Sequence, residues 1–421
     1  MRRHVRIGNI LGKGFKPMSA LALKFLTVSG LALTLASTGA FAKQNSCDDP
    51  IVIGTTISMT GPLASLTPGW DKVTEAFAEE VNKSGGLMLK SCNKRVPIKF
   101  VIYDDQSNPA TATSLHEKMA TVDNVDVFAG VDWSFVVGPV SNVAEKYKIP
   151  LIGGNVATPA LFERGLKYFW ATPYPMTFNW DLNFADMLKN VDPKPKTIFW
   201  VTQDNPVYKS VFDIWSKKHE AAGIKMVGSE IFPNDIKDFS SIALKIRAAK
   251  PDLIYINSFD NIAVPLVQQL RQMRIKAMGV HFPIASAALA EQTKAYGGIE
   301  GMTSVASWIP GVKGEFNALI ETVYKKAGVS LEATATNMPR FTAYLMMIQA
   351  IEKAGVVDRE KIREALFKGT FKGPNAQITF DETGAPDTKT LVTQIQDGKF
   401  TIVWPEAQAT SKLRWPSPSW Q

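Results

Sequence analysis

The sequence has few of the residues that build metal sites and redox centres. Its 421 residues include only two cysteines and four histidines, and neither a Cys-x-x-Cys nor a His-Glu-x-x-His spacing occurs. A zinc site therefore lacks a recognisable ligand set. No Gly-x-Gly-x-x-Gly follows the first predicted strand, and neither a Walker-type phosphate loop nor a Gly-x-Ser-x-Gly turn is present. We predict no metal and no cofactor, and these absences weigh against an enzyme without excluding one.

Long apolar runs are also missing after residue 42, where no segment approaches the 18 apolar residues that a membrane-spanning helix needs. Before that point the chain carries six basic and no acidic residues, the apolar run Phe25–Ala36, and small residues at 40–42. This pattern predicts a signal peptide over 1–42, cleaved before Lys43. Met18 is an alternative start, and an uncleaved membrane anchor is the alternative interpretation.

Once the leader is removed, the chain has little net charge. Six of the 47 Lys and Arg residues lie in the leader and all 39 Asp and Glu residues lie after it, so the mature charge falls from +8 to +2. The basic balance thus gives little support for a nucleic-acid partner, and we predict none. About 380 residues remain, enough for two domains.

Both cysteines, Cys47 and Cys92, lie in the exported part of the chain. Because exported proteins meet an oxidising environment, we expect a disulfide between them. Two free thiols, or half of a metal site, are the alternatives.

Short β-rich apolar runs alternate with helical segments along the mature chain, which predicts parallel sheets with crossover helices. The first series of predicted strands is Ile51–Ile57, Ile98–Tyr103, Asp126–Ala129, Ile149–Ile152 and Tyr168–Ala171. A proline-rich passage, Thr172–Pro175, interrupts it. The second series is Thr197–Val201, Lys225–Ile231, Leu253–Asn257, Ala277–Val280 and Met302–Val305. We therefore predict an α/β protein with two doubly wound domains.

The last quarter of the chain follows the second series of strands. Helical segments at Glu315–Lys326 and Phe341–Lys353 come too late to belong simply to the second sheet, so we expect the chain to return to the first domain. We also expect a final β-hairpin between Gln377–Phe380 and Val392–Ile395.

Several ordered segments resemble the leucine/isoleucine/valine-type periplasmic binding proteins. They are Ile53–Ala64, Glu80–Leu87, Tyr103–Ala110, Asp238–Ser241, Lys250–Asp252, Ala350–Gly355 and Ile378–Gly384. The resemblance covers nearly the whole mature chain, and so many matches in the same order make it specific.

This resemblance implies the substrate-binding subunit of an ABC importer, with two α/β lobes joined by a three-crossover hinge. Lobe 1 would hold residues 48–171 plus 308–381, and lobe 2 would hold 172–305 plus 388–404, followed by a C-terminal tail at 405–421. The implied protein is a monomer in the periplasm that binds a small molecule and meets permease subunits in the inner membrane. A disulfide would tie the N-terminus to the entrance of the neighbouring strand.

Open parallel sheets bind ligands at the carboxyl ends of their strands, beside helix N-termini whose free N–H groups favour a carboxylate. Two polar turns follow the third and fourth predicted strands. By the resemblance, Ser134 is the carboxylate-binding serine, and the second turn contacts the ligand through main chain and a hydroxyl. That second turn contributes Asn155, Val156, Ala157 and Thr158. Helix capping is the alternative role for a Ser or an Asn at such turns.

Five further residues are candidates for ligand contacts. Tyr208 matches a family tyrosine that lines the cleft, and Trp133 could form an apolar wall or belong to the core. Phe259 and Asp260 follow a strand of the second series, and the carboxylate of Asp260 is the one we would pair with a cation. His281 ends another strand, where it either contacts ligand or is a satisfied polar group.

One departure from the family limits the choice of ligand. Amino-acid binders of this type usually offer an acidic residue to the ligand ammonium from the window that here reads Met278–Phe282, which contains no acid. A buried ammonium without a counter-charge is costly. Either Asp260, Asp132 or another acid substitutes, or the ligand is a small, partly apolar carboxylate or amide, aromatic or aliphatic. Hydrophobic amino acids come next, and the alternative functions are a solute sensor for a receptor or a secreted α/β enzyme.

Overall fold

The computed structural model describes residues 47–172, 181–285, 287–331, 334–387 and 389–421. The predicted signal peptide, 1–42, and all but the first residue of the passage Thr172–Pro175 lie outside the described residues. No helix within these ranges is both long enough and apolar enough to cross a membrane.

The first sheet contains all five strands of the first predicted series. Its strands are β1 (Ile51–Ile57), β4 (Ile98–Asp104), β5 (Val127–Val131), β6 (Leu151–Gly153) and β7 (Phe169–Ala171). They are parallel and lie in the order β4-β1-β5-β6-β7. The predicted bounds differ from the observed ones by at most two residues, because strand ends depend on hydrogen bonds that periodicity does not report.

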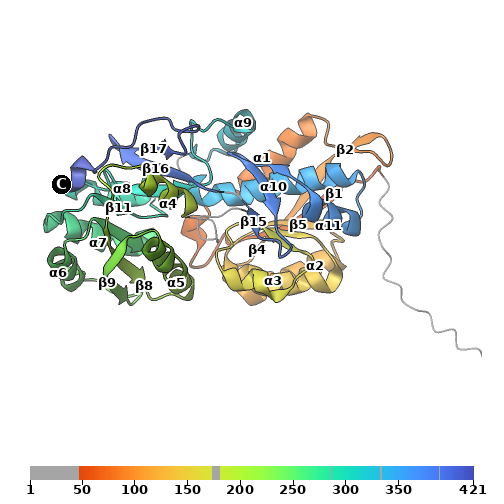
Figure 1. The fold of residues 1–421 in the computed structure, drawn as a ribbon. Helices are drawn as coiled ribbons and strands as arrows, with labels where there is room; N and C mark the ends of the chain where they lie inside the picture. The colour runs from red at the N-terminus through yellow and green to blue at the C-terminus, as the bar shows by residue number, and fades with distance from the viewer. Residues whose placement is uncertain (1–46, 173–180, 286, 332–333, 388) are drawn as a thin grey trace, which may run out of the picture. The chain divides into compact units, whose positions relative to one another are not determined.

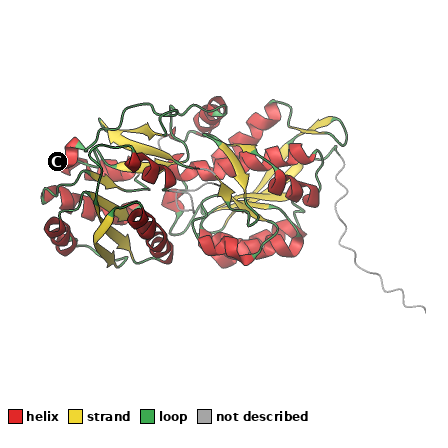
Figure 2. Cartoon of the chain, in the orientation of Figure 1, coloured by secondary structure: helices red, strands yellow, loops and turns green. Residues whose placement is uncertain are grey.

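Helices cover both faces of this sheet (Figure 2). They are α1 (Trp70–Lys83), α2 (Pro109–Thr121), α3 (Ser134–Tyr147), α9 (Asn317–Ala327), α10 (Thr334–Ala354) and α11 (Arg359–Lys368). One core contains α1 and α10, where Phe77 packs edge-on against Phe341 with ring centroids 5.1 Å apart. A second core, on the face where Phe128 points, contains α2 and α3. The predicted return of the chain to the first sheet is thus confirmed, and Figure 1 shows α10 and α11 in blue among the orange and yellow elements.

The second sheet contains the second predicted series and two further strands. Its strands are β8 (Thr197–Gln203), β9 (Lys225–Phe232), β10 (Leu253–Asn257), β11 (Gly279–His281), β12 (Thr303–Ala306), β16 (Leu391–Gln396) and β17 (Lys399–Trp404). The order is β17-β16-β12-β11-β10-β8-β9, parallel from β9 to β12 and antiparallel beyond.

Helices again cover both faces of the second sheet. They are α4 (Leu182–Lys189), α5 (Pro206–Ala221), α6 (Ser240–Ala249), α7 (Asp260–Gln272) and α8 (Ala287–Thr293). Successive residues of β8 point to opposite cores: Phe199 packs among α6 and α7, whereas Trp200 packs among α4 and α5. This alternation, on both sides of a parallel sheet, is what a doubly wound α/β unit requires.

The predicted final hairpin is wrong. β14 (Gln377–Phe380) pairs with β13 (Phe371–Lys372) and β15 (Pro386–Asp387) in a separate small sheet, whereas β16 pairs with β17. The reason is the turn Asp397-Gly398, in which both residues have a positive φ. A two-residue Asp-Gly turn of this kind joins adjacent antiparallel strands, so the hairpin forms one strand later than expected.

The C-terminal segment, 405–421, packs on the second sheet. Its backbone forms hydrogen bonds with the residues before β11. The carbonyl of Trp420 accepts the N–H of Ala277, and the N–H of Ser417 donates to the carbonyl of Met278. The buried indole of Trp420 also lies under the guanidinium of Arg271, 3.6 Å from the ring centroid.

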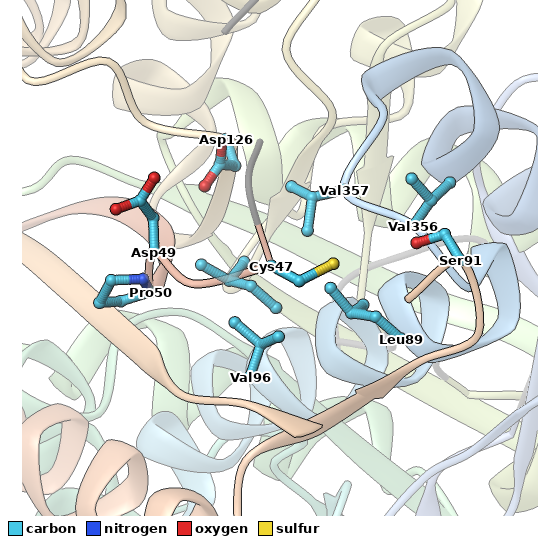
Figure 3. A pocket seen from close by; sticks show the side chains of 10 residues that line it. Cys47, Asp49, Pro50, Leu89, Ser91, Val96, Asp126, Val356 and Val357 are labelled. Atoms are coloured by element: carbon cyan, nitrogen blue, oxygen red, sulfur yellow. The ribbon is translucent and has the colours of Figure 1, made fainter. Parts of the chain in front are cut away.

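The predicted disulfide between Cys47 and Cys92 is present, with Cα atoms 6.6 Å apart. Cys47 precedes β1, and Cys92 lies in the turn between β2 (Leu87–Leu89) and β3 (Lys94–Val96). Figure 3 shows Cys47 beside a small pocket of about 20 Å³ that is also lined by Leu89, Val96 and Val357. That volume suits about one water molecule.

We expect the double substitution Cys47→Ser and Cys92→Ser to lower the free energy of unfolding by roughly 4 kcal/mol, because the bond closes a loop of 45 residues. Urea denaturation of the oxidised protein and the variant measures the difference. A reductant should destabilise the wild type and leave the variant unchanged; equal midpoints for all samples would contradict the expectation.

His116, buried in α2, predicts a second stability effect. Burial lowers the pKa of His116 from 6.5 to about 4. The unfolded chain therefore binds a proton near pH 6.5 that the folded state refuses until about pH 4, so stability is lost as the pH falls through this window. Between pH 7 and pH 4.5, we expect the free energy of unfolding of His116→Phe to fall by roughly 2 kcal/mol less than that of the wild type. Urea denaturation at a series of pH values measures both proteins, and equal losses would contradict the expectation.

Candidate functional site

The turn after β5 brings Trp133 and Ser134 to the carboxyl edge of the first sheet. Ser134 begins α3, and the residue before it, Trp133, has a positive φ of 68° with ψ of 120°. A bulky side chain rarely adopts this conformation, and such strain persists only where surrounding contacts impose it. One of those contacts is the N–H of Trp133, which donates to the carbonyl of Asn155 at 3.2 Å.

The hydroxyl of Ser134 joins this turn to the one after β6. Its Oγ accepts the N–H groups of Ala157 at 2.8 Å and Thr158 at 3.1 Å. A serine hydroxyl has two acceptor sites and one donor, so both acceptor sites are used. Ser134 therefore holds the second turn in place, and it can offer only its hydrogen to a third group.

A buried ion pair that the sequence did not reveal supports both turns. Asp132 and Arg340 are 3% and 2% exposed, and Arg340 Nε donates to Asp132 Oδ2 at 2.6 Å. Asp132 Oδ1 in turn accepts the backbone N–H of Asn155 at 3.0 Å and its side-chain amide at 2.6 Å. Gly154 lets the turn approach this closely, because a Cβ there would lie 2.2 Å from Asp132 Oδ1.

The remaining donors of Arg340 are also used. Nη1 donates to Thr55 Oγ1 and to the Tyr344 hydroxyl, each at 3.0 Å, and Nη2 donates to the carbonyl of Thr56 at 2.9 Å. Burial opposes the charged guanidinium, but the charge of Asp132 and the hydrogen bonds to Asp132 and Tyr344 together outweigh it, so the pKa of Arg340 lies above its ordinary value. Since each partner compensates the other, Asp132 is not a counter-charge for a ligand ammonium. An arginine inside an apolar helix was the signal that could have revealed the pair.

Trp133 forms a stack with Trp70. The ring centroids are 6.4 Å apart at an interplanar angle of 11°, and the guanidinium of Arg340 lies 4.9 Å from the centre of the Trp70 ring. Trp133 is 8% exposed, so most of its ring belongs to the core of the first lobe.

Beside the second sheet, Tyr208 in α5 and Phe259 in the loop after β10 lie together. Their rings meet edge to face with centroids 5.2 Å apart, and Asn257 Nδ2 donates to the carbonyl of Tyr208 at 2.7 Å. The N–H of Phe259 donates to Gln203 Oε1 at 2.9 Å, which fixes the loop after β10 to the end of β8. Asp260 begins α7, and its side chain lies outside the described residues.

His281 ends β11 and is buried. Nδ1 lies 2.9 Å from Thr303 Oγ1, and Nε2 lies 3.1 Å from a carboxylate oxygen of Asp181, whose other oxygen accepts the Tyr255 hydroxyl at 2.9 Å. The imidazole also stacks on Phe184, with centroids 3.6 Å apart. Both ring nitrogens thus have partners inside the protein, which favours the structural interpretation of His281.

Two pockets in the described part of the chain are lined by none of the predicted ligand residues. One is the small pocket beside Cys47. The other has a volume of about 370 Å³ and is lined by Phe162, Glu163, Asp381, Thr383, Ala385, Pro386 and Asp387. No cluster of His, Cys, Asp or Glu among the described residues is arranged to hold a metal ion.

Two doubly wound sheets whose polar turns follow the carboxyl ends of parallel strands define the class of type I periplasmic binding proteins. The chain belongs to the periplasmic binding protein family, whose model matches residues 50–399. The resemblance noted in the sequence is thereby confirmed.

Three similar proteins show the extent of the match. The Leu/Ile/Val-binding protein BraC3 of Rhizobium johnstonii is 27% identical over 85% of this chain and 94% of its own. Two solved structures share the fold. The leucine-binding protein LivK of Thermotoga maritima is 20% identical, with a TM-score of 0.65 over 84% of this chain and 97% of its own. An ABC transporter solute-binding protein of R. palustris in complex with 4-hydroxybenzoate is 20% identical, with a TM-score of 0.69 over 88% of this chain and 99% of its own.

We expect Arg340→Met to lower the free energy of unfolding by about 3–5 kcal/mol, because it leaves the charge of Asp132 buried without a partner. The matched control is Arg363→Met, which removes a partly exposed pair with Glu360 and should cost less than about 1 kcal/mol. Urea denaturation at neutral pH compares the two. Equal losses would mean that the buried pair has no special role.

Proposed function

We propose that this protein is the periplasmic substrate-binding subunit of an ABC importer and that it captures a small, partly apolar carboxylate or amide. The ligand would enter a cleft between lobe 1, residues 48–171 plus 308–381, and lobe 2, residues 172–305 plus 388–404. The observation that carries the proposal is Ser134, whose hydroxyl has both acceptor sites used and only its hydrogen to offer.

The charges near Ser134 favour an anion over an α-amino acid. A carboxylate or amide oxygen accepts the hydrogen of Ser134, and hydrogen bonds to charged acceptors are the stronger kind. An ammonium would need an acid. Asp132 is compensated by Arg340, and the window Met278–Phe282 contains none. Without such a partner the ammonium of a bound amino acid would be costly to bury.

The apolar part of the ligand would contact the aromatic side chains of Tyr208, Phe259 and, at its exposed edge, Trp133. A dissociation constant of about 1 μM corresponds to about −8 kcal/mol, which a few charge-assisted hydrogen bonds and one stacked ring supply after ordering costs. The solved relative with 4-hydroxybenzoate supports an aromatic acid, and the name of BraC3 supports hydrophobic amino acids as the second candidate.

The transport step would involve no covalent change. The predicted leader sends the chain to the periplasm, where one lobe captures the solute and closure of the two lobes removes it from water. The closed monomer then presents a composite surface to the permease. The family of the chain and the binding-protein names of its relatives support a carrier over an enzyme.

We expect Ser134→Ala to weaken binding of benzoate-type acids by at least about tenfold, because one hydrogen bond to a charged group is lost. Isothermal titration calorimetry with benzoate, short amides, leucine and phenylalanine measures the effect. Ser141→Ala is the control, because that hydroxyl donates to Gly138 within the same helix. An unchanged affinity in Ser134→Ala would contradict the role of Ser134, and tight binding of branched-chain amino acids alone would reject a carboxylate ligand.

A further inference from the structure

Two neighbouring buried polar atoms in the second sheet have no hydrogen-bond partner among the described residues. Thr202 and Asn257 are register neighbours at the carboxyl ends of β8 and β10. Each is 1% exposed. Among the described residues, neither Thr202 Oγ1 nor Asn257 Oδ1 has a hydrogen-bond partner. Buried polar atoms are nearly always paired, so two orphans side by side require an explanation.

Several other buried polar groups of this sheet are paired. Thr303 Oγ1 lies 2.9 Å from His281 Nδ1, the Tyr255 hydroxyl donates to Asp181, and the Ser304 hydroxyl donates to a backbone carbonyl at 2.8 Å. Thr202 and Asn257 differ from these residues in their position. They lie at the carboxyl edge of the parallel strands, where open α/β sheets bind their ligands.

The orientation of the Asn257 side-chain amide determines whether its absent partner must donate or accept a hydrogen bond. Its Nδ2 donates to the carbonyl of Tyr208 at 2.7 Å, so Oδ1 is the atom without a partner, and it can only accept. Thr202 can both donate and accept. A single hydroxyl group satisfies both residues, because it donates to Asn257 Oδ1 and accepts from Thr202.

We propose that Thr202 and Asn257 form a subsite for a hydroxyl group of the ligand, which makes the preferred ligand a hydroxylated small carboxylate. The inference rests on the proposed function, since it adds a second recognition point to the same solute. Tyr208 touches the subsite through its carbonyl, and Phe259 packs on the Tyr208 ring, so an apolar wall adjoins the hydroxyl. Both orphan atoms are covered in this structure, and a ligand reaches them when neighbouring side chains move aside.

Thr202→Val tests the subsite, because valine keeps the shape of threonine and removes the hydroxyl. Calorimetric titration of the full mature protein with benzoate and 4-hydroxybenzoate gives the ratio of the two affinities. We expect the wild type to bind the hydroxylated acid about tenfold more tightly, and Thr202→Val to reduce that ratio to nearly one. Since the hydroxyl has no partner among the residues that the structure describes, the urea midpoint of Thr202→Val should not fall.

Thr303→Val is the matched control, because its hydroxyl is paired with His281 inside the fold. This variant should lose stability and keep the preference for the hydroxylated acid. Equal binding of the two acids by the wild type would overturn the subsite and leave the carboxylate proposal standing. A stability loss in Thr202→Val with an unchanged ratio would also overturn it, since a buried water would then explain the hydroxyl. Binding of neither acid would overturn the subsite and the choice of an aromatic acid as ligand.

Discussion

The first lobe depends on one buried guanidinium. Arg340 reaches from α10 to Asp132, 208 residues earlier, and its other donors hold Thr55 and Thr56 at the end of β1. Asp132 in turn accepts two hydrogen bonds from Asn155, so the ion pair supports the turns that follow β5 and β6. A buried pair of this kind adds little net stability, but it imposes one arrangement because each charge is costly without the other.

The ion pair also decides what the edge of the first sheet can offer. With the charge of Asp132 compensated, the Ser134 hydroxyl beside it can still donate its hydrogen. The edge of the second sheet has the opposite character, because Asn257 Oδ1 is an acceptor. A solute that carries an oxygen anion at one end and a hydroxyl at the other complements both edges.

Most of the fold could be predicted from local patterns. Each of the ten strands expected for the two parallel sheets is present, because a buried parallel strand is a short apolar run that needs no knowledge of its neighbours. The prediction of the final hairpin was wrong because it depended on which strands pair. β14 and β16 have similar apolar sequences, and the turn Asp397-Gly398 pairs β16 with β17 instead. The sequence likewise left both roles of His281 open, because its partner Asp181 lies 100 residues away.

The sequence by itself determined the order of the elements, the disulfide, the family, and the polar turns that follow the strands. These follow from periodicity, cysteine number and the spacing of motifs, all of which are local. Only the tertiary structure decided that Arg340 compensates Asp132 and that both nitrogens of His281 are used. It also showed that Thr202 and Asn257 each keep one atom without a partner among the described residues. Hydrogen-bond partnership is a property of three-dimensional neighbours, and a chain that folds back through α10 brings together residues that no local pattern connects.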